Sequence, residues 1–366
     1  MKRLTLLLLV LCLSLCSCLQ PEQPSNDGDG APDPAPFSAE EAANAFLTEG
    51  RIVDCSRREY SYSEMLEDLQ ALKEQHPTRL SLREIGTSLD GRAIPLAILG
   101  NPSAQRQILV SAGIHGREYL TPLLVMKQLE FYLTYYDTGS FDGTSYSTLF
   151  DSCAFYVVPM SNPDGIMLSQ EGLSSVRSEE LREKIQGIYE ADKRDGMTSQ
   201  VQIDSYLQYW KANANGVDLN RNFDALWKEY SNISRSCHAQ YKGPFAASEP
   251  ETQALVSLVE ELDDLCAVLC IHSQGEVLYW NCGQTGSLYS ETLSLTQTVA
   301  DGNGYEIVFD QNNDASFSDW CALEKGLVAI TVETGKGLCP LDTEKFLPIW
   351  EDNYDLLARS AAHFQK

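Results

Sequence analysis

The sequence predicts an α/β domain built on a mixed, largely parallel sheet that is flanked by helices. Apolar runs bounded by Gly, Pro, Asn or Asp, which are typical of buried strands, occur at residues 94–99, 107–112, 154–159, 267–272 and 327–333. Helical patterns precede, separate and follow these runs, at residues 60–76, 122–135, 178–193, 249–262, 289–300 and 343–364. Because strands alternate with helices along the chain, we expect a layered domain around the sheet.

The first helical pattern shows the periodicity on which these assignments depend. Met65, Leu66, Leu69 and Leu72 recur at helical spacing within residues 60–76, opposite an acidic face. This spacing predicts an amphipathic helix.

The length and the net charge of the chain limit the classes of protein to which it can belong. The chain has 366 residues, of which 43% are hydrophobic, so it can bury a large core. Its formal net charge of -25, from 52 acidic and 27 basic residues, would repel phosphate backbones. We therefore expect no nucleic acid among its partners.

The first 18 residues have the pattern of an export signal. A basic start is followed by an apolar run over residues 4–15, which is shorter than the roughly 20 residues of a spanning helix. The small Ser17 before Cys18 resembles the lipobox of bacterial lipoproteins, which implies that Cys18 is acylated and holds the protein at a membrane surface. Acylation of Cys16 and an ordinary cleaved signal peptide are the alternatives.

Composition divides the rest of the chain into two parts. Residues 19–50 begin with a segment rich in Pro, Gly, Asp and Ser and are expected to be a disordered tether, whereas residues 51–366 are expected to fold as one domain. We expect export to the outer surface of the cell membrane as a lipoprotein, or secretion. Eight of the 11 cysteines follow the leader, and their spacing leaves disulfide pairing open.

Ionisable residues stand at the ends of three apolar runs. His115, His272 and Glu333 each stand at the end of such a run, and Glu118 comes three residues after His115. Ligands of open α/β sheets bind where strands end, and zinc at catalytic sites takes three nitrogen or oxygen ligands plus water. A carboxylate at the end of a buried strand also needs a partner or a task, because its burial unpaired is costly.

Residues 216–223 (GVDLNRNF) form another polar group. Asp218 and Asn220 can close a turn. Asn220 and Arg221 also offer an amide and a planar guanidinium, which suit a carboxylate ligand.

These segments occur together in the order found in one family. The chain resembles the zinc metallocarboxypeptidases of the carboxypeptidase A kind, especially their bacterial branch, which includes γ-D-glutamyl-diamino-acid peptidases. The resemblance runs from about Tyr60 to the end and includes residues 86–92 (GTSLDGR), 113–118 (GIHGRE), 162–165 (NPDG), 210–213 (WKAN), 216–223, 248–252 (SEPET) and 331–335 (TVETG). It implies a three-layer, carboxypeptidase-like fold.

The resemblance also implies a metal site and a mechanism. It makes His115, Glu118 and His272 the ligands of one Zn²⁺ per chain, the two-histidine, one-glutamate set known for carboxypeptidase A. Glu333 becomes the general base that acts on the metal-bound water.

Further residues of the resemblance concern the substrate. Asn220 and Arg221 match the pair that binds the terminal carboxylate, and Arg117 matches an arginine that contacts the substrate. Lys211 stands where digestive members carry an oxyanion-stabilising arginine, and the small Ser318 lies at the base of the side-chain pocket. The mobile tyrosine of those members has no counterpart in residues 309–314 (FDQNND).

The resulting expectation is a monomeric zinc carboxypeptidase that hydrolyses peptides, including peptides or muropeptides derived from the cell wall. An endopeptidase that cuts a γ-linked wall peptide is the first alternative, although Arg221 argues against it. An inactive, peptide-binding lipoprotein is the second, and the intact set of ionisable residues argues against that one.

Overall fold

The computed structural model describes residues 39–48, 52–57, 59–230, 233–280, 283–309 and 314–365. The strands in these residues are β1 (Leu80–Thr87), β2 (Ala93–Leu99), β3 (Gln107–Ala112), β4 (Ser140–Phe141), β5 (Thr144–Ser145), β6 (Ala154–Val158), β7 (Leu265–His272), β8 (Val277–Trp280), β9 (Glu306–Phe309) and β10 (Val328–Glu333). The α-helices are α1 (Ala39–Thr48), α2 (Tyr62–Gln75), α3 (Leu120–Thr134), α4 (Tyr146–Ser152), α5 (Pro163–Glu171), α6 (Glu179–Arg194), α7 (Ile203–Leu207), α8 (Pro250–Glu261), α9 (Gly286–Asn303), α10 (Phe317–Leu323), α11 (Phe346–Asn353) and α12 (Leu356–His363). The described residues also form three short 3-10 helices, η1 (Gly172–Ser175), η2 (Leu219–Arg221) and η3 (Thr343–Lys345).

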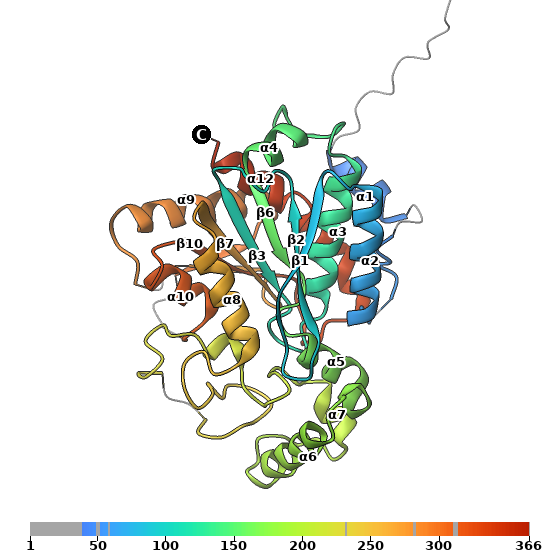
Figure 1. Ribbon diagram of the computed structural model, residues 1–366, viewed down its shortest axis with the longest axis vertical. Helices are drawn as coiled ribbons and strands as arrows, with labels where there is room; N and C mark the ends of the chain where they lie inside the picture. The colour runs from blue at the N-terminus through green and yellow to red at the C-terminus, as the bar shows by residue number, and fades with distance from the viewer. Residues whose placement is uncertain are drawn as a thin grey trace, which may run out of the picture. The chain divides into compact units, whose positions relative to one another are not determined.

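One mixed sheet forms the centre of the fold (Figure 1). Within the described residues its eight strands have the order β1-β2-β6-β3-β7-β10-β8-β9. The central strands β6, β3, β7 and β10 run parallel, whereas β1, β2 and β8 pair antiparallel with their neighbours toward the middle. The prediction of a mixed, largely parallel sheet is confirmed, and the carboxyl ends of β3, β7 and β10 meet at one edge.

Helices cover both faces of this sheet, which gives three layers. On one face, α3 packs beside α2 and α11, and its buried residues join a large apolar core that includes Ile108, Val110 and Leu269. On the other face lie α8 and α10 (Figure 1). Leu255 of α8 and Trp320 of α10 are buried in a cluster with alternate strand residues. Alternation along the strands thus supplies two cores, as a sheet buried on both sides requires.

The sequence-based assignment of the last helix is wrong in one respect. Residues 343–364 were expected to form one helix, but α11 ends at Asn353 and α12 begins at Leu356. Gln128 donates a hydrogen bond to the Asn353 carbonyl (2.6 Å), and the Tyr132 hydroxyl donates one to the Tyr354 carbonyl (2.8 Å). These bonds from α3 satisfy backbone groups at the break, so the chain can turn without leaving buried carbonyls unpaired.

The N-terminal boundary of the folded part also differs from the expectation. Helix α1 lies within residues 19–50, the predicted tether, yet Ala43 and Phe46 are fully buried. The Phe46 ring stacks on Trp350, and the Trp350 indole nitrogen donates a hydrogen bond to the Ala43 carbonyl (3.1 Å). Because α1 contributes to the core, the predicted tether is too long, and the compact unit begins at Ser38. The predicted signal peptide, residues 1–18, and residues 19–38 lie outside the described residues.

Two further properties concern the described residues alone. Their helices are all too short or too polar to cross a membrane. Their seven cysteines are free thiols, so pairing involving these residues is not part of the structure.

Candidate metal centre

The loop after β3 carries the first two metal-ligand candidates. Gly113 adopts a positive φ of 61°, and a Cβ on Gly116 would lie 2.3 Å from the Gly165 carbonyl oxygen, so both positions favour glycine. The Thr121 hydroxyl accepts a hydrogen bond from the Gly113 amide (3.0 Å) and donates one to the Glu118 carbonyl (2.9 Å). The loop is thereby fixed as a tight turn that aims both side chains inward.

Two adjacent parallel strands position the other two predicted residues. His272 ends β7, Glu333 ends β10, and the two residues are direct partners in the sheet. Thr334 fixes this end of the sheet, because its amide and its hydroxyl both donate to the His272 carbonyl (2.8 and 2.9 Å). The register of the two strands therefore brings Glu333 beside His272, which is one of the metal-ligand candidates.

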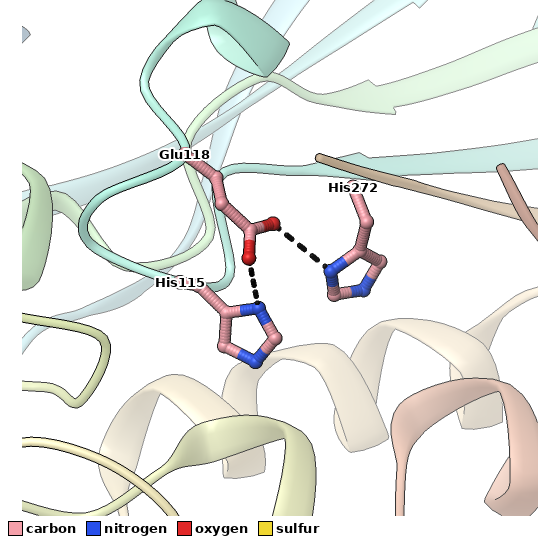
Figure 2. A group of neighbouring side chains, drawn as sticks. All are labelled: His115, Glu118 and His272. Carbon is pink, nitrogen blue, oxygen red and sulfur yellow. Dashed lines mark hydrogen bonds and ion pairs between the residues drawn. The ribbon is translucent and has the colours of Figure 1, made fainter. Parts of the chain in front are cut away.

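The three predicted ligands converge on one point (Figure 2). Glu118 lies between the two imidazoles, with its Oε1 2.7 Å from His115 Nδ1 and its Oε2 3.1 Å from His272 Nδ1. One ligand atom from each residue lies within 4.8 Å of the others, and all three side chains are buried.

The chemistry of this group fits zinc. Two imidazole nitrogens and a carboxylate are the donor set of catalytic zinc sites. Burial acts to raise the pKa of Glu118, but the charges of His115 and His272 outweigh it and hold that pKa well below its usual value. The carboxylate is therefore ionised, as a metal ligand must be.

Asp218 contacts His115 on the side of the ring away from Glu118. The sequence did not identify this residue as part of the site. Its fully buried carboxylate lies 3.2 Å from the second ring nitrogen of His115 and 3.6 Å from Lys211 Nζ. Burial opposes its ionisation, but the charges of Lys211 and His115 hold the pKa of Asp218 well below its usual value. A carboxylate on the outer nitrogen of a ligand histidine fixes the ring orientation and tautomer. The only signal in the sequence was an acidic residue in an otherwise apolar GVDL segment.

A cavity of about 880 Å³ opens beside the metal group. Its lining includes four predicted site residues. His115 and Glu333 are assigned to metal binding and proton transfer, and Asn220 and Arg221 are assigned to the substrate carboxylate. The Asn220 side-chain oxygen accepts the Phe317 amide hydrogen (3.0 Å), and the Arg221 guanidinium donates to the Tyr230 hydroxyl (3.0 Å). The guanidinium is thus held in the wall of the cavity that Glu333 also lines.

The remaining predicted residues separate into two groups. Lys211 and Ser318 line the same cavity, and the Ser318 hydroxyl lies 3.1 Å from that of Thr331. Arg117 is not among the residues of this lining. Its carbonyl accepts a hydrogen bond from the Cys339 thiol (3.2 Å), and its charge acts to lower the pKa of Glu333.

Glu333 has the pKa of a group that can exchange protons near neutral pH. Burial raises its pKa to about 7, assisted by the negative charge of Glu118 and opposed by the charges of His272, Lys211 and Arg117. A general acid or base is most effective when its pKa lies near the working pH. Its position beside His272 and in the cavity wall suits that task.

Comparison with known proteins identifies the family. The profile of the zinc carboxypeptidase family matches residues 65–356. The chain is 30% identical over 286 residues to the uncharacterised protein YqgT of Bacillus subtilis. This alignment covers 77% of this chain and 72% of that protein. It is 29% identical over 306 residues to γ-D-glutamyl-L-diamino acid endopeptidase 1 of Lysinibacillus sphaericus, which covers 82% and 72% of the two chains.

A solved structure shows the same fold. Thrombin-activatable fibrinolysis inhibitor aligns with 89% of this chain and 80% of its own length, with a TM-score of 0.65 and 17% identity. Carboxypeptidase A from Helicoverpa armigera aligns with 88% of this chain and 79% of its own length, with a TM-score of 0.59 and 19% identity. The carboxypeptidase-like architecture expected from the sequence is thereby confirmed. The chain belongs to the zinc carboxypeptidase family, and it is a peptidase with one zinc ion per chain.

Proposed function

We propose that this peptidase removes residues from the carboxyl end of peptides. The observation that carries the proposal is the position of Arg221 and Asn220, which line the same cavity as His115 and Glu333. A guanidinium can bind a carboxylate through charge-assisted hydrogen bonds. A site that pairs such a group with a hydrolytic centre is suited to a substrate with a free terminal carboxylate.

The proposed mechanism assigns a task to each ionisable group. His115, Glu118 and His272 would hold the zinc ion, and Asp218 would orient His115. The chemistry that a bound zinc ion would supply is that of a Lewis acid, which would activate water and polarise the scissile carbonyl. Glu333 accepts a proton from the attacking water and donates it to the leaving amine.

Lys211, Ser318 and Arg117 complete the proposal. Lys211 lies in the cavity wall with its ammonium near Asp218, where its positive charge can stabilise a developing oxyanion. Ser318 forms part of the wall that surrounds the terminal side chain. Arg117 is assigned to the substrate only through the family resemblance.

The decisive experiment compares one peptide as the free acid and as the terminal amide. We expect release of the C-terminal residue from the free acid, inhibition of this release by a chelator, and no cleavage of the amide. Arg221→Ala removes the guanidinium that would bind the terminal carboxylate, and we expect a loss on the order of 100-fold in kcat/KM for the free acid. Equal cleavage of the acid and the amide would contradict carboxypeptidase action.

A second candidate function is cleavage within a γ-linked cell-wall peptide. It is favoured by the similarity to γ-D-glutamyl-L-diamino acid endopeptidase 1 over 82% of this chain. Mass spectrometry of muropeptides after digestion distinguishes the two activities, because an endopeptidase releases a fragment that retains the substrate's own C-terminal residue together with the residue before it. A carboxypeptidase releases single terminal residues.

We also propose export and lipidation at Cys18, with the enzyme acting as a monomer at the outer surface of the cell membrane. The basic start, the short apolar run and the Ser17-Cys18 pair support this proposal. Cys18→Ala is expected to move the protein from the membrane fraction to the soluble fraction. Light scattering of the detergent-free, truncated domain measures its oligomeric state.

A further inference from the structure

The side chain of Asn162 joins three segments of the chain beside the metal-ligand candidates. Asn162 is fully buried between β6 and α5. Its Nδ2 donates hydrogen bonds to the Ile114 carbonyl (3.1 Å) and to the Ala212 carbonyl (3.1 Å). Its Oδ1 accepts one from the Gly165 amide (2.9 Å), which caps the first turn of α5. Both ends of this side-chain amide are therefore used in contacts within the protein.

The two carbonyls that accept these hydrogen bonds each adjoin a residue of the site. Ile114 precedes His115, and Ala212 follows Lys211. The carboxylate of Asp218 lies between the two site residues, 3.2 Å from His115 Nε2 and 3.6 Å from Lys211 Nζ. The bridging amide thus connects two loops whose side chains share one carboxylate.

The segments around this amide approach each other at backbone distance. The Gly116 amide donates a hydrogen bond to the Lys211 carbonyl (3.1 Å). A Cβ on Gly165 would lie 2.4 Å from the Ala212 carbonyl oxygen and 2.4 Å from Asn162 Nδ2. Closely packed groups transmit small displacements, so a shift of one loop is passed to the other.

Loss of the amide hydrogens would release both loops. The carbonyls of Ile114 and Ala212 would lose these partners inside the protein. An unpaired buried carbonyl is costly, so each loop would move toward other partners. Such a movement changes the position of the His115 ring relative to Asp218, and that of Lys211 relative to both.

We propose that Asn162 is a positioning residue, which fixes His115 relative to Lys211 by hydrogen-bonding both of their loops. Asn162 lies outside the lining of the cavity, so it acts through these two residues and not on the substrate. Metal affinity depends on the orientation of each ligand ring, so the affinity for zinc reports on this role. The proposal gives a task to residues 162–165 (NPDG), to which the family resemblance assigned none.

The test measures the zinc affinity of Asn162→Asp and Asn162→Ala by competition with a chromophoric chelator. Aspartate caps a helix as well as asparagine does, so Asn162→Asp keeps the contact with α5. As a carboxylate it has no hydrogen to donate to the two loop carbonyls. We expect both variants to bind zinc about tenfold more weakly than the parent. The added negative charge would by itself favour a cation, so a loss in Asn162→Asp cannot be an effect of charge.

The matched control is Asn353→Ala, which removes another buried amide. Asn353 is 1% exposed at the end of α11, and its Nδ2 donates to the Tyr305 hydroxyl (2.8 Å) and to the Ile349 carbonyl (2.9 Å). The control and Asn162→Ala are both expected to unfold at lower urea concentration than the parent, but the control is expected to keep the zinc affinity of the parent. An equal loss of zinc affinity in the control would overturn the proposal, because lower stability alone would then explain the effect.

Kinetics at saturating zinc give a second measurement, with any peptide that the parent cleaves. We expect Asn162→Asp to lower kcat by about tenfold and to change KM by less than about twofold, because its lost bonds concern His115 and Lys211 and not Arg221. Parental zinc affinity and parental kcat in Asn162→Asp would show that the residue only caps α5. The zinc measurement does not depend on which peptide bond is cleaved, so failure of the proposed carboxypeptidase function would leave it unaffected.

Discussion

Glu251 provides a quantitative test of the buried polar network that supports the site. The side chain is fully buried at the start of α8, where it accepts hydrogen bonds from the Leu89 amide (3.0 Å) and from Asn213 Nδ2 (3.1 Å). Asn213 belongs to the loop that carries Lys211 and Asp218. Burial, assisted by the like charge of Asp164, raises the pKa of Glu251 from 4.5 to about 7.

The raised pKa sets the sign and size of a pH effect on stability. The folded state binds the proton more tightly than the unfolded state, so the stability that protonated Glu251 contributes is fully present below pH 4.5 and is lost as the pH rises through about 7. At about 1.4 kcal/mol per pKa unit, the rise corresponds to roughly 3 kcal/mol. Glu251→Gln keeps the shape of the side chain and removes this dependence.

The assay is urea unfolding of the parent and of Glu251→Gln at several pH values between 4.5 and 8. At the acidic end the variant is expected to be less stable than the parent by about 1 kcal/mol. The NH2 group of the introduced side chain cannot accept the hydrogen bond that Asn213 Nδ2 donates to Glu251. The stability of the variant relative to the parent is expected to rise by roughly 3 kcal/mol toward pH 8. Any release of zinc at acidic pH lowers the stability of the parent and of the variant alike, so it largely cancels in the difference between their unfolding free energies.

The exposed Glu183 supplies the control, and Glu183→Gln is expected to follow the parent at every pH. A constant difference between Glu251→Gln and the parent across this range would refute the reasoning. It would mean that Glu251 has no raised pKa in the folded protein.

Three further changes test other parts of the structure. Asp218→Asn is expected to weaken zinc binding by about 10- to 100-fold, measured by competition with a chromophoric chelator, because the outer nitrogen of His115 loses its carboxylate; unchanged affinity would exclude this role. Phe46→Ala removes a fully buried ring of α1 and is expected to cost about 3–5 kcal/mol of unfolding free energy, whereas a negligible loss would show that α1 is not part of the core. Glu333→Gln is expected to retain zinc and to lose about 10²- to 10⁴-fold in kcat, and parental activity would contradict the proposed general base.

The parts of the fold that could be predicted are those whose signal is local. The central strands were found because long apolar runs such as those of β3 and β7 are buried on both faces. Strands β8 and β9 were missed because each has four residues and is only partly buried. The break at Tyr354 depends on hydrogen bonds from Gln128 and Tyr132, more than 200 residues earlier, which no local pattern reveals.

The same distinction applies to the site. His115, His272 and Glu333 could be selected from the sequence because an ionisable residue at the end of an apolar strand is unusual, and the structure brings them together with Glu118. The partners of the site were not predictable in this way. Asp314 meets Arg221 only through the folded chain, across 93 residues of sequence, and nothing in the local sequence of either residue indicates the contact.

The central claim is that His115, Glu118 and His272 hold one zinc ion. The most direct test is the zinc content per chain of purified, dialysed protein, measured for the parent, for His272→Ala and for His76→Ala, which changes a histidine at the end of α2. We expect about one zinc ion in the parent and in His76→Ala, and little or none in His272→Ala. A full zinc content in His272→Ala, or none in the parent after growth with zinc, would contradict the account.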